Sequence, residues 1–326
     1  MIDYTIFYKS NLQLNEEWSE ENRWDLFISA FNSNKRVQTV YDKVKATIKY
    51  WLLLQDYNYK DGEHPISNIY IANTKNEGEC INDYFKGYLH NKGYKDIRKL
   101  KICIDITGFI RPYLMYLIRY LKYNDVNKVD IIYSEPSYYK NKEKTEFSGT
   151  VVSKVRQVDG FQGSHNTTYT SNEILIIGCG YETELIKKVA EHKNNTKKIL
   201  VFGFPSLQAT MYQDNILRTY EAKEPVSFSN LTTPPCYFAP ANDPFVVASV
   251  LSEIVKEANQ KKKITNLYLS PLATKPQVLG FVLYYLTECI DKEVSIIFPY
   301  TNVYAKETAT EISRIWKYQI EFYALK

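Results

Sequence analysis

Short apolar runs that alternate with amphipathic segments constrain the fold of this chain more than any other feature. The runs are six to nine residues long and predict strands, whereas the segments between them have helical periodicity. Strands that alternate with crossover helices form a mostly parallel sheet that is covered on both faces. The predicted strands are 24–31, 48–55, 67–74, 99–107, 129–135, 173–178, 197–204, 265–271 and 294–300, and the predicted helices are 34–46, 76–91, 111–124, 183–194, 206–222, 244–260 and 275–290.

The number of predicted strands is sufficient for two sheets. We therefore predict an α/β protein of two Rossmann-like lobes, residues 1–150 and 151–326, each with a mostly parallel sheet flanked by helices. The polar stretch 136–172 separates the lobes and predicts a hairpin or a mobile excursion. Residues 223–243 contain four prolines and predict a loop, and residues 319–325 predict an edge strand.

Composition excludes several classes of protein. With 326 residues, 44% of them apolar and 24% charged, the chain can form a large core. A net charge of +4 is too small to indicate direct nucleic-acid binding. The five cysteines are scattered without a CxxC pair, so we expect neither a metal site nor a disulfide framework. We see no signal peptide and no apolar run long enough to span a membrane, which favours a cytoplasmic location.

The turns that follow the predicted strands carry small, hydroxylated or glycine residues. Right-handed crossovers place every strand-to-helix turn at the carboxyl edge of the sheet, where ligands of open parallel sheets bind. Asp105 could accept a hydrogen bond from a ribose hydroxyl, and Arg111 or Lys275 could pair with a phosphate. The alternative explanation is structural, because the same residue types are common in tight turns and at helix caps. The predicted ligand-binding residues are Asp105, Thr107, Gly108, Arg111, Gly178, Gly180, Ser206, Thr274 and Lys275.

Sequence motifs of known catalytic sites are missing. There is no GxxxxGK[ST], HExxH or GxSxG, and the glycines of residues 178–182 lack the third glycine of a dinucleotide fingerprint. No resident cofactor is therefore indicated, although the strand ends suggest a nucleotide ligand. If the chain is an enzyme, Glu135 and Glu182 are the candidate catalytic carboxylates, because Glu135 ends one predicted strand and Glu182 follows another.

Two of the strand ends resemble a known family. Residues 105–112, DITGFIRP, and residues 269–277, LSPLATKPQ, resemble conserved turns of CRISPR-associated Rossmann-fold (CARF) domains and of the related two-lobed SAVED domains. The resemblance implies a sensor of cyclic oligonucleotides in prokaryotic antiviral defence, acting with a protein effector or as a homo-oligomer. It points to Asp105, Thr107 and Arg111 in one lobe and to Thr274 and Lys275 in the other. Leu272 and Ala273 replace the paired glycines of the family, and no effector domain is recognisable.

Two other functions fit the same sequence. Residues 24–44 are similar to the first strand and helix of a TIR domain, which implies an enzyme that cleaves the glycosidic bond of NAD or a nucleoside. Such an enzyme needs a carboxylate near the ribose to stabilise an oxocarbenium ion. A non-catalytic scaffold subunit of a larger complex is the third hypothesis, because the chain carries so few recognisable motifs.

Overall fold

The computed structural model describes residues 2–139, 151–222, 235–306 and 309–325. The chain divides into two compact units, which we name after their central strands. The β2 unit comprises Phe7–Thr145 and Val303–Lys326, and the β8 unit comprises Met1–Ile6 and Glu146–Asn302. The boundary between the two units, at residues 145/146, lies close to the predicted division at residue 150. Each end of the chain, however, belongs to the unit that is formed mainly by the other half.

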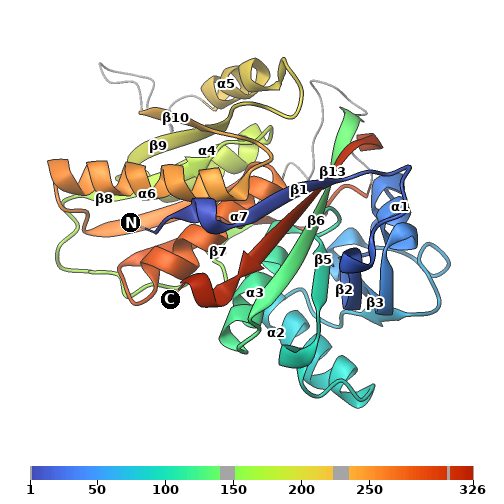
Figure 1. The fold of residues 1–326 in the computed structure, drawn as a ribbon. Helices are drawn as coiled ribbons and strands as arrows, with labels where there is room; N and C mark the ends of the chain where they lie inside the picture. Colours follow the sequence, from blue (N-terminus) through green and yellow to red (C-terminus); the bar gives the residue numbers. More distant parts are fainter. Residues whose placement is uncertain (1, 140–150, 223–234, 307–308, 326) are drawn as a thin grey trace. The chain divides into compact units, whose positions relative to one another are not determined.

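The β2 unit contains seven strands among its described residues (Figure 1). The strands are β1 (Tyr8–Leu12), β2 (Arg23–Ala30), β3 (Lys45–Leu53), β4 (Ile69–Ile71), β5 (Ile102–Asp105), β6 (Lys128–Tyr139) and β13 (Ala309–Glu321). The helices are α1 (Lys35–Lys43), α2 (Glu77–Asn82), the π-helical η4 (Asp83–Leu89) and α3 (Arg111–Tyr123). Short 3-10 turns are η2 (Glu20–Asn22), η3 (Gln55–Tyr57), η5 (Ile97–Lys99) and η9 (Phe322–Leu325).

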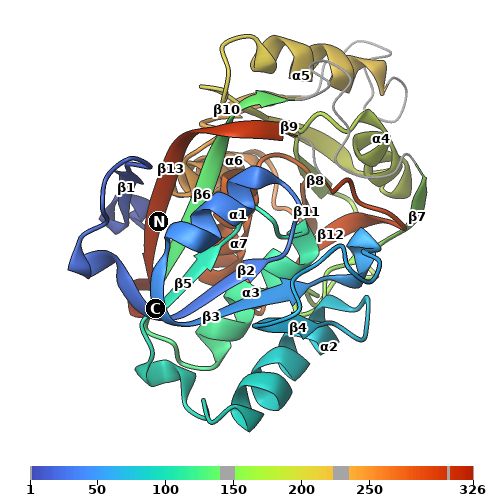
Figure 2. The ribbon, with the colours of Figure 1, turned by 90° about the vertical axis from the view of Figure 1, so that its right-hand side faces the viewer.

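Strand order makes the β2 unit a doubly wound sheet. The order is β1-β13-β6-β5-β2-β3-β4, and the strands from β6 to β4 are mutually parallel. Helix α1 covers one face, and α2 and α3 cover the other (Figure 2). The core beneath α1 contains Trp24, Phe27, Val40 and Cys103. The indole nitrogen of Trp24 donates to the buried carboxylate of Asp130 at 2.8 Å, so this interior polar group is satisfied.

The β8 unit repeats the same design. Its described strands are β7 (Val152–Gln157), β8 (Glu173–Gly178), β9 (Lys197–Gly203), β10 (Cys236–Ala239), β11 (Asn266–Pro271) and β12 (Val294–Thr301). Its helices are η1 (Tyr4–Ile6), α4 (Thr183–His192), α5 (Met211–Glu221), α6 (Pro244–Lys261), α7 (Lys275–Tyr284) and the π-helical η8 (Tyr285–Cys289). The strand order is β10-β9-β8-β11-β12-β7, with only β7 antiparallel to its neighbour.

Both units therefore follow one topology. Each sheet has five parallel strands, β2 to β6 in one unit and β8 to β12 in the other. In both, the first of the five is central, the second and third lie on one side of it, and the fourth and fifth lie on the other. An antiparallel strand, β13 or β7, pairs with the fifth. The predicted α/β fold of two Rossmann-like lobes is confirmed. Such a shared order is what a duplication would produce. Within the described ranges, no helix is both long enough and apolar enough to cross a membrane.

Several local predictions were wrong. The predicted hairpin in 136–172 is not formed, because β6 continues to Tyr139 and β7 pairs with β12 and not with β6. Residues 140–150, to which the alternative of a mobile excursion also applies, lie outside the described residues. Of the predicted edge strand 319–325, residues 319–321 are strand, but they end β13, which lies between β1 and β6, and residues 322–325 form η9. Residues 236–239 form β10 within the predicted loop, whose residues 223–234 lie outside the described part of the chain. Helix α5 begins at Met211, five residues later than predicted.

Candidate functional site

Asp105 lies at the point where the winding of the β2 sheet reverses. The chain runs from β2 through β3 to β4 on one side and from β5 to β6 on the other. The connections that leave the carboxyl ends of the adjacent strands β2 and β5 therefore run to opposite sides of the sheet, and open α/β sheets bind ligands at such a point. Ser29 and Asp105 are register partners at this position, and both side chains are fully buried. Asp105 thus lies at the topological switch point of the β2 sheet.

The carboxylate of Asp105 is held by its own turn. Its Oδ1 accepts from the backbone N–H of Thr107 at 2.9 Å, and its Oδ2 accepts from the Ser29 hydroxyl at 3.4 Å. Burial raises the pKa of Asp105 to about 6, although these hydrogen bonds and the positive charge of Arg36 oppose the shift. The turn is fixed further by Thr107, whose hydroxyl lies 3.0 Å from the Ser134 hydroxyl. Direct contact between Asp105 and a ligand stays a prediction.

Arg36 brings a buried positive charge to the same edge. It lies in the first turn of α1, where its backbone N–H is accepted by the side chain of Asn34, the N-cap residue. Its guanidinium donates to the carbonyl oxygen of Ser134 on β6. Its Nε has no hydrogen-bond partner among the described residues, although Arg36 is only 7% exposed. Nothing in the sequence distinguishes Arg36 as a site residue, because it falls within an ordinary amphipathic helix.

Gly108 closes the turn onto the neighbouring strand. A Cβ at this position would lie 2.3 Å from the carbonyl oxygen of Ala30, so only glycine permits this approach. The carbonyl of Gly108 accepts from the hydroxyl of Tyr57 at 2.9 Å. These contacts pack the turn closely over the switch point, and the polar cluster of Ser29, Asp105 and Ser134 is covered in this conformation.

An aromatic recess opens beside the switch point. It has a volume of about 370 Å³ and lies between α1, the ends of β2 and β3, and the loop at residues 62–65. Trp51 stacks on Tyr41 with ring centroids 3.7 Å apart, and Phe31 meets Trp51 edge-on at 5.4 Å. The recess exists because the connection from β3 to β4 contains only a 3-10 turn among its regular elements. Its lining residues are Phe31, Gln38, Tyr41, Asp42, Trp51, Gly62, Glu63, His64 and Pro65.

The β8 unit has its own switch point between β8 and β11. Ser270 is the register partner of Ile177, is fully buried, and has no hydrogen-bond partner for its hydroxyl within the described residues. A Cβ at Gly180 would lie 2.2 Å from the carbonyl oxygen of Leu272, so the turn after β8 packs against the turn after β11. Gly178, at the end of β8, lies against the ring of Phe281.

The predicted residues Thr274 and Lys275 begin helix α7. Thr274 is the N-cap: its hydroxyl accepts from the backbone N–H of Gln277 and donates to the carbonyl of Ala241. Lys275 is the first helical residue and is partly exposed, and Arg111 holds the same position in α3 but is buried. Each is followed by a proline, which suits the first turn. The two switch points therefore share a cation–proline start to the following helix.

The remaining predicted residues lie in other local settings. Ser206 donates to the carbonyl of Gln208, and does not cap α5. Glu135 lies on β6, where its Oε2 accepts from the indole nitrogen of Trp316 at 2.7 Å. Glu182 is a buried residue at the N-terminus of α4. Both glutamates are thus interior groups, and their proposed catalytic role is still a hypothesis.

Three residues of the β8 unit have the connectivity of a nucleophilic triad. Nε2 of His165 lies 2.5 Å from the Ser295 hydroxyl, and Nδ1 lies 3.3 Å from the side-chain oxygen of Asn266. Ser295 is fully buried, however, and its oxygen also accepts from Gln157 and from the backbone N–H of Gly163. An oxygen surrounded in this way cannot reach a substrate carbonyl. The arrangement instead attaches the segment around residue 163 to the sheet.

Comparison with known proteins provides no relative on which to base an assignment. No family model, no curated protein and no solved structure matches this chain. Across the described ranges, no group of three or more His, Cys, Asp or Glu side chains is arranged to hold a metal ion. Function must therefore be argued from the geometry of the two switch points and of the cavities.

Proposed function

We propose that this chain is a nucleotide-binding regulatory protein whose ligand occupies the aromatic recess of the β2 unit. The observation that carries the proposal is the position of this recess on β3, one strand from the switch point of a doubly wound sheet, since Trp51 is the register partner of Ser29 and Ser29 is the register partner of Asp105. Its volume of about 370 Å³ falls within the range of small-molecule sites. A nucleobase would contact the partly exposed ring of Tyr41 and the small exposed parts of Phe31 and Trp51, each 5% exposed.

Polar groups around the recess suit the rest of a nucleotide. Gln38, Asp42 and His64 line it and can exchange hydrogen bonds with the edge of a base. The N-terminus of α1 faces the carboxyl edge and carries the exposed Lys35, which would attract a phosphate. Asp105 and Arg36 are buried and would not contact the ligand. Their hydrogen bonds to Thr107 and Ser134 would instead hold the ends of β5 and β6 in place.

The resemblance to CARF and SAVED domains supports a regulatory role in prokaryotic defence. It would make the ligand a cyclic oligonucleotide and would require an effector protein or a second copy of the chain. A recess of about 370 Å³ accommodates one nucleoside, so the other nucleotides of such a ligand would lie outside it. Glycosidic-bond cleavage is the alternative activity, with Glu135 or Glu182 as the carboxylate. The second alternative is a non-catalytic scaffold subunit of a larger complex, in which the chain binds no nucleotide.

Intrinsic fluorescence tests the proposal. All four tryptophans, at positions 18, 24, 51 and 316, belong to the β2 unit, and Trp51 lines the recess. Titration with mononucleotides, NAD and cyclic oligonucleotides should quench this fluorescence for the true ligand. A ligand at a hundred times its Kd should also stabilise the fold by about 2.7 kcal/mol. In Gln38→Trp, the added ring would fill the recess, and we expect affinity to fall at least about tenfold through lost burial of the base.

Asp61→Trp is the matched control, since Asp61 is exposed in the adjacent loop but does not line the recess. It should bind as tightly as the wild type. Equal affinity in Gln38→Trp would exclude the recess as the binding site. Absence of any response at millimolar nucleotide would reject the proposal and favour the scaffold hypothesis. Release of nicotinamide from NAD, lost in Glu135→Gln or Glu182→Gln, would favour the enzyme.

A further inference from the structure

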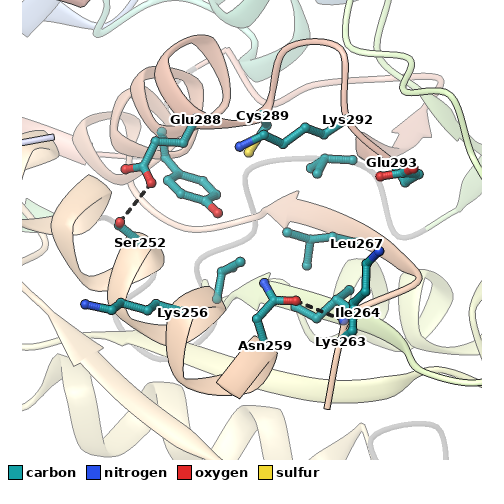
Figure 3. Close-up of a pocket in the computed structure, with 13 residues that line it drawn as sticks. Ser252, Lys256, Asn259, Lys263, Ile264, Leu267, Glu288, Cys289, Lys292 and Glu293 are labelled. Atoms are coloured by element: carbon teal, nitrogen blue, oxygen red, sulfur yellow. Dashed lines mark hydrogen bonds between the residues drawn. The ribbon is translucent and has the colours of Figure 1, made fainter. Parts of the chain in front are cut away.

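A second cavity lies at the opposite end of the β8 sheet from its switch point. It has a volume of about 380 Å³ and is enclosed by α6, the turn at residues 263–264, the first residues of β11 and β12, and η8 (Figure 3). The cavity therefore lies at the amino edge of the strands, and none of the residues predicted from the sequence to bind a ligand lines it. Lys263 belongs to the lysine run 261–263, which would otherwise be a simple solvated turn.

The floor of the cavity is apolar. Val255, Ile264, Leu267 and Val294 line it together with the ring of Tyr284. Leu267 and Tyr284 are almost fully buried, so their exposed atoms face only the cavity. A floor of this kind favours an alkyl or aromatic group by the ordinary hydrophobic effect, and it does not favour a fully hydrated ion.

The rim of the cavity carries positive charge. Lys256, Lys263 and Lys292 line it, and within the described residues none of them forms an ion pair. Asn259 lies between Lys256 and Lys263, and its side-chain oxygen accepts from the backbone N–H of Ile264 at 2.9 Å. Because that oxygen is occupied, the amide group is left with its N–H donors for a ligand.

The two acidic residues that line the cavity, Glu288 and Glu293, lie apart from Lys256, Asn259 and Lys263. Glu288 accepts from the hydroxyls of Ser252 and Tyr4, each at 3.0 Å, so both of its oxygens are already engaged. In Figure 3, Glu288 lies across the cavity from Asn259 and Lys263, and Glu293 is an exposed residue at the outer edge. The part of the rim formed by Lys256, Asn259 and Lys263 thus offers donors and cations without an acid among them.

From this juxtaposition we propose that the cavity binds a small amphipathic anion. The carboxylate or phosphate of the ligand would lie against Lys256, Asn259 and Lys263, and its alkyl or aromatic body would enter over Leu267 and Val294. This site is distinct from the proposed nucleotide site in residues, in structural unit and in ligand chemistry. It would allow a small acidic metabolite to bind the β8 unit independently of the nucleotide.

Isothermal titration calorimetry on the whole chain tests the site with matched probes. Octanoate and phenyl phosphate supply the two anionic head groups, and 1-octanol and phenol are their neutral counterparts. We expect at least one anion to bind and its neutral counterpart to bind at least about tenfold more weakly, because a hydrogen bond to a charged group would be lost. Octanoate and phenyl phosphate together distinguish an aliphatic carboxylate from an aromatic phosphate.

Substitution of the rim identifies the residues. Lys256→Gln and Lys263→Gln should each weaken the anion about tenfold. Lys261→Gln is the matched control, because Lys261 is exposed on the same helix end but does not line the cavity, and it should bind normally. The recess variant Gln38→Trp should also bind normally. Equal weakening in Lys261→Gln, equal binding of the neutral probes, or no heat with either anion at millimolar concentration would overturn the proposal.

Discussion

Asp105→Asn is expected to remove a pH dependence from the stability of the β2 unit. Between pH 4.5 and pH 7.5, the wild type should lose about 2 kcal/mol relative to the variant. Burial raises the pKa of Asp105 from 3.8 to about 6, so the folded state binds its proton more tightly than the unfolded state does. Protonation of Asp105 therefore stabilises the fold most strongly below pH 4. That contribution is lost as the pH rises through 6, and over the whole range it amounts to about 3 kcal/mol.

The asparagine can preserve the structure of the turn. Its side-chain oxygen can still accept from the backbone N–H of Thr107, which is 2.9 Å from Oδ1 in the wild type. Its amide nitrogen replaces Oδ2, and the Ser29 hydroxyl can rotate to accept from it instead of donating. The substitution therefore removes the buried titration without removing a hydrogen bond, which makes it a cleaner test than a change to alanine.

Urea denaturation at several pH values measures the effect. Tryptophan fluorescence reports on the correct unit, because all four tryptophans belong to the β2 unit. Asp61→Asn removes an exposed carboxylate of the same unit, and we expect it to follow the wild type at every pH. If Asp105→Asn also followed the wild type at every pH, then Asp105 would not be buried as described, and its turn would be open to solvent.

The sequence predicted the layered fold because burial on both faces leaves a direct signal. Strands β5 and β8 contain the apolar runs 102–104 and 174–177, and each strand is followed by an amphipathic helix. Strand β13 lacked that signal. Its residues are of mixed burial and include several charges, yet its backbone pairs with β6 along most of its length and with β1 at residues 315–319. Backbone pairing of this kind depends on the position of distant strands, which a local pattern does not contain.

The candidate site was only partly predictable for a related reason. Asp105 was placed correctly at a strand end, because the end of an apolar run identifies the carboxyl edge. Its carboxylate is held by the local N–H of Thr107, but the strand that lies beside it carries Ser29, which is 76 residues away in sequence. The aromatic recess joins Phe31, Tyr41 and Trp51 from three separate elements, and in a chain with 29 tyrosines a single aromatic residue is uninformative. Only the folded structure brings these rings together.

Gly280→Val is expected to destabilise the β8 unit by about 3 kcal/mol. Helices α6 and α7 cross at Gly280, where an added Cβ would lie 2.6 Å from the carbonyl oxygen of Pro244 and 2.6 Å from the Cβ of Val247. One of these contacts is backbone, so no rotamer change relieves it and the helices must separate. In Gly280→Ala, a gain in helix propensity of about 1 kcal/mol opposes the clash, and we expect a smaller net loss of about 1 kcal/mol.

Gly87→Ala provides the matched control for this prediction. Gly87 lies in the helical segment η4, and a Cβ there would meet the side chain of Asp83, which accepts from Tyr70 through its other oxygen and would have to shift slightly. The stability of Gly87→Ala should therefore change much less than that of Gly280→Val. Hydrogen exchange localises the damage in Gly280→Val, where amides of α6 and α7 should lose protection. Because α6 and Tyr284, the last residue of α7, line the second cavity, octanoate or phenyl phosphate binding should weaken in parallel. Unchanged protection in Gly280→Val would mean that α6 and α7 do not approach closely at Gly280, and the enclosure of the cavity would then need another explanation.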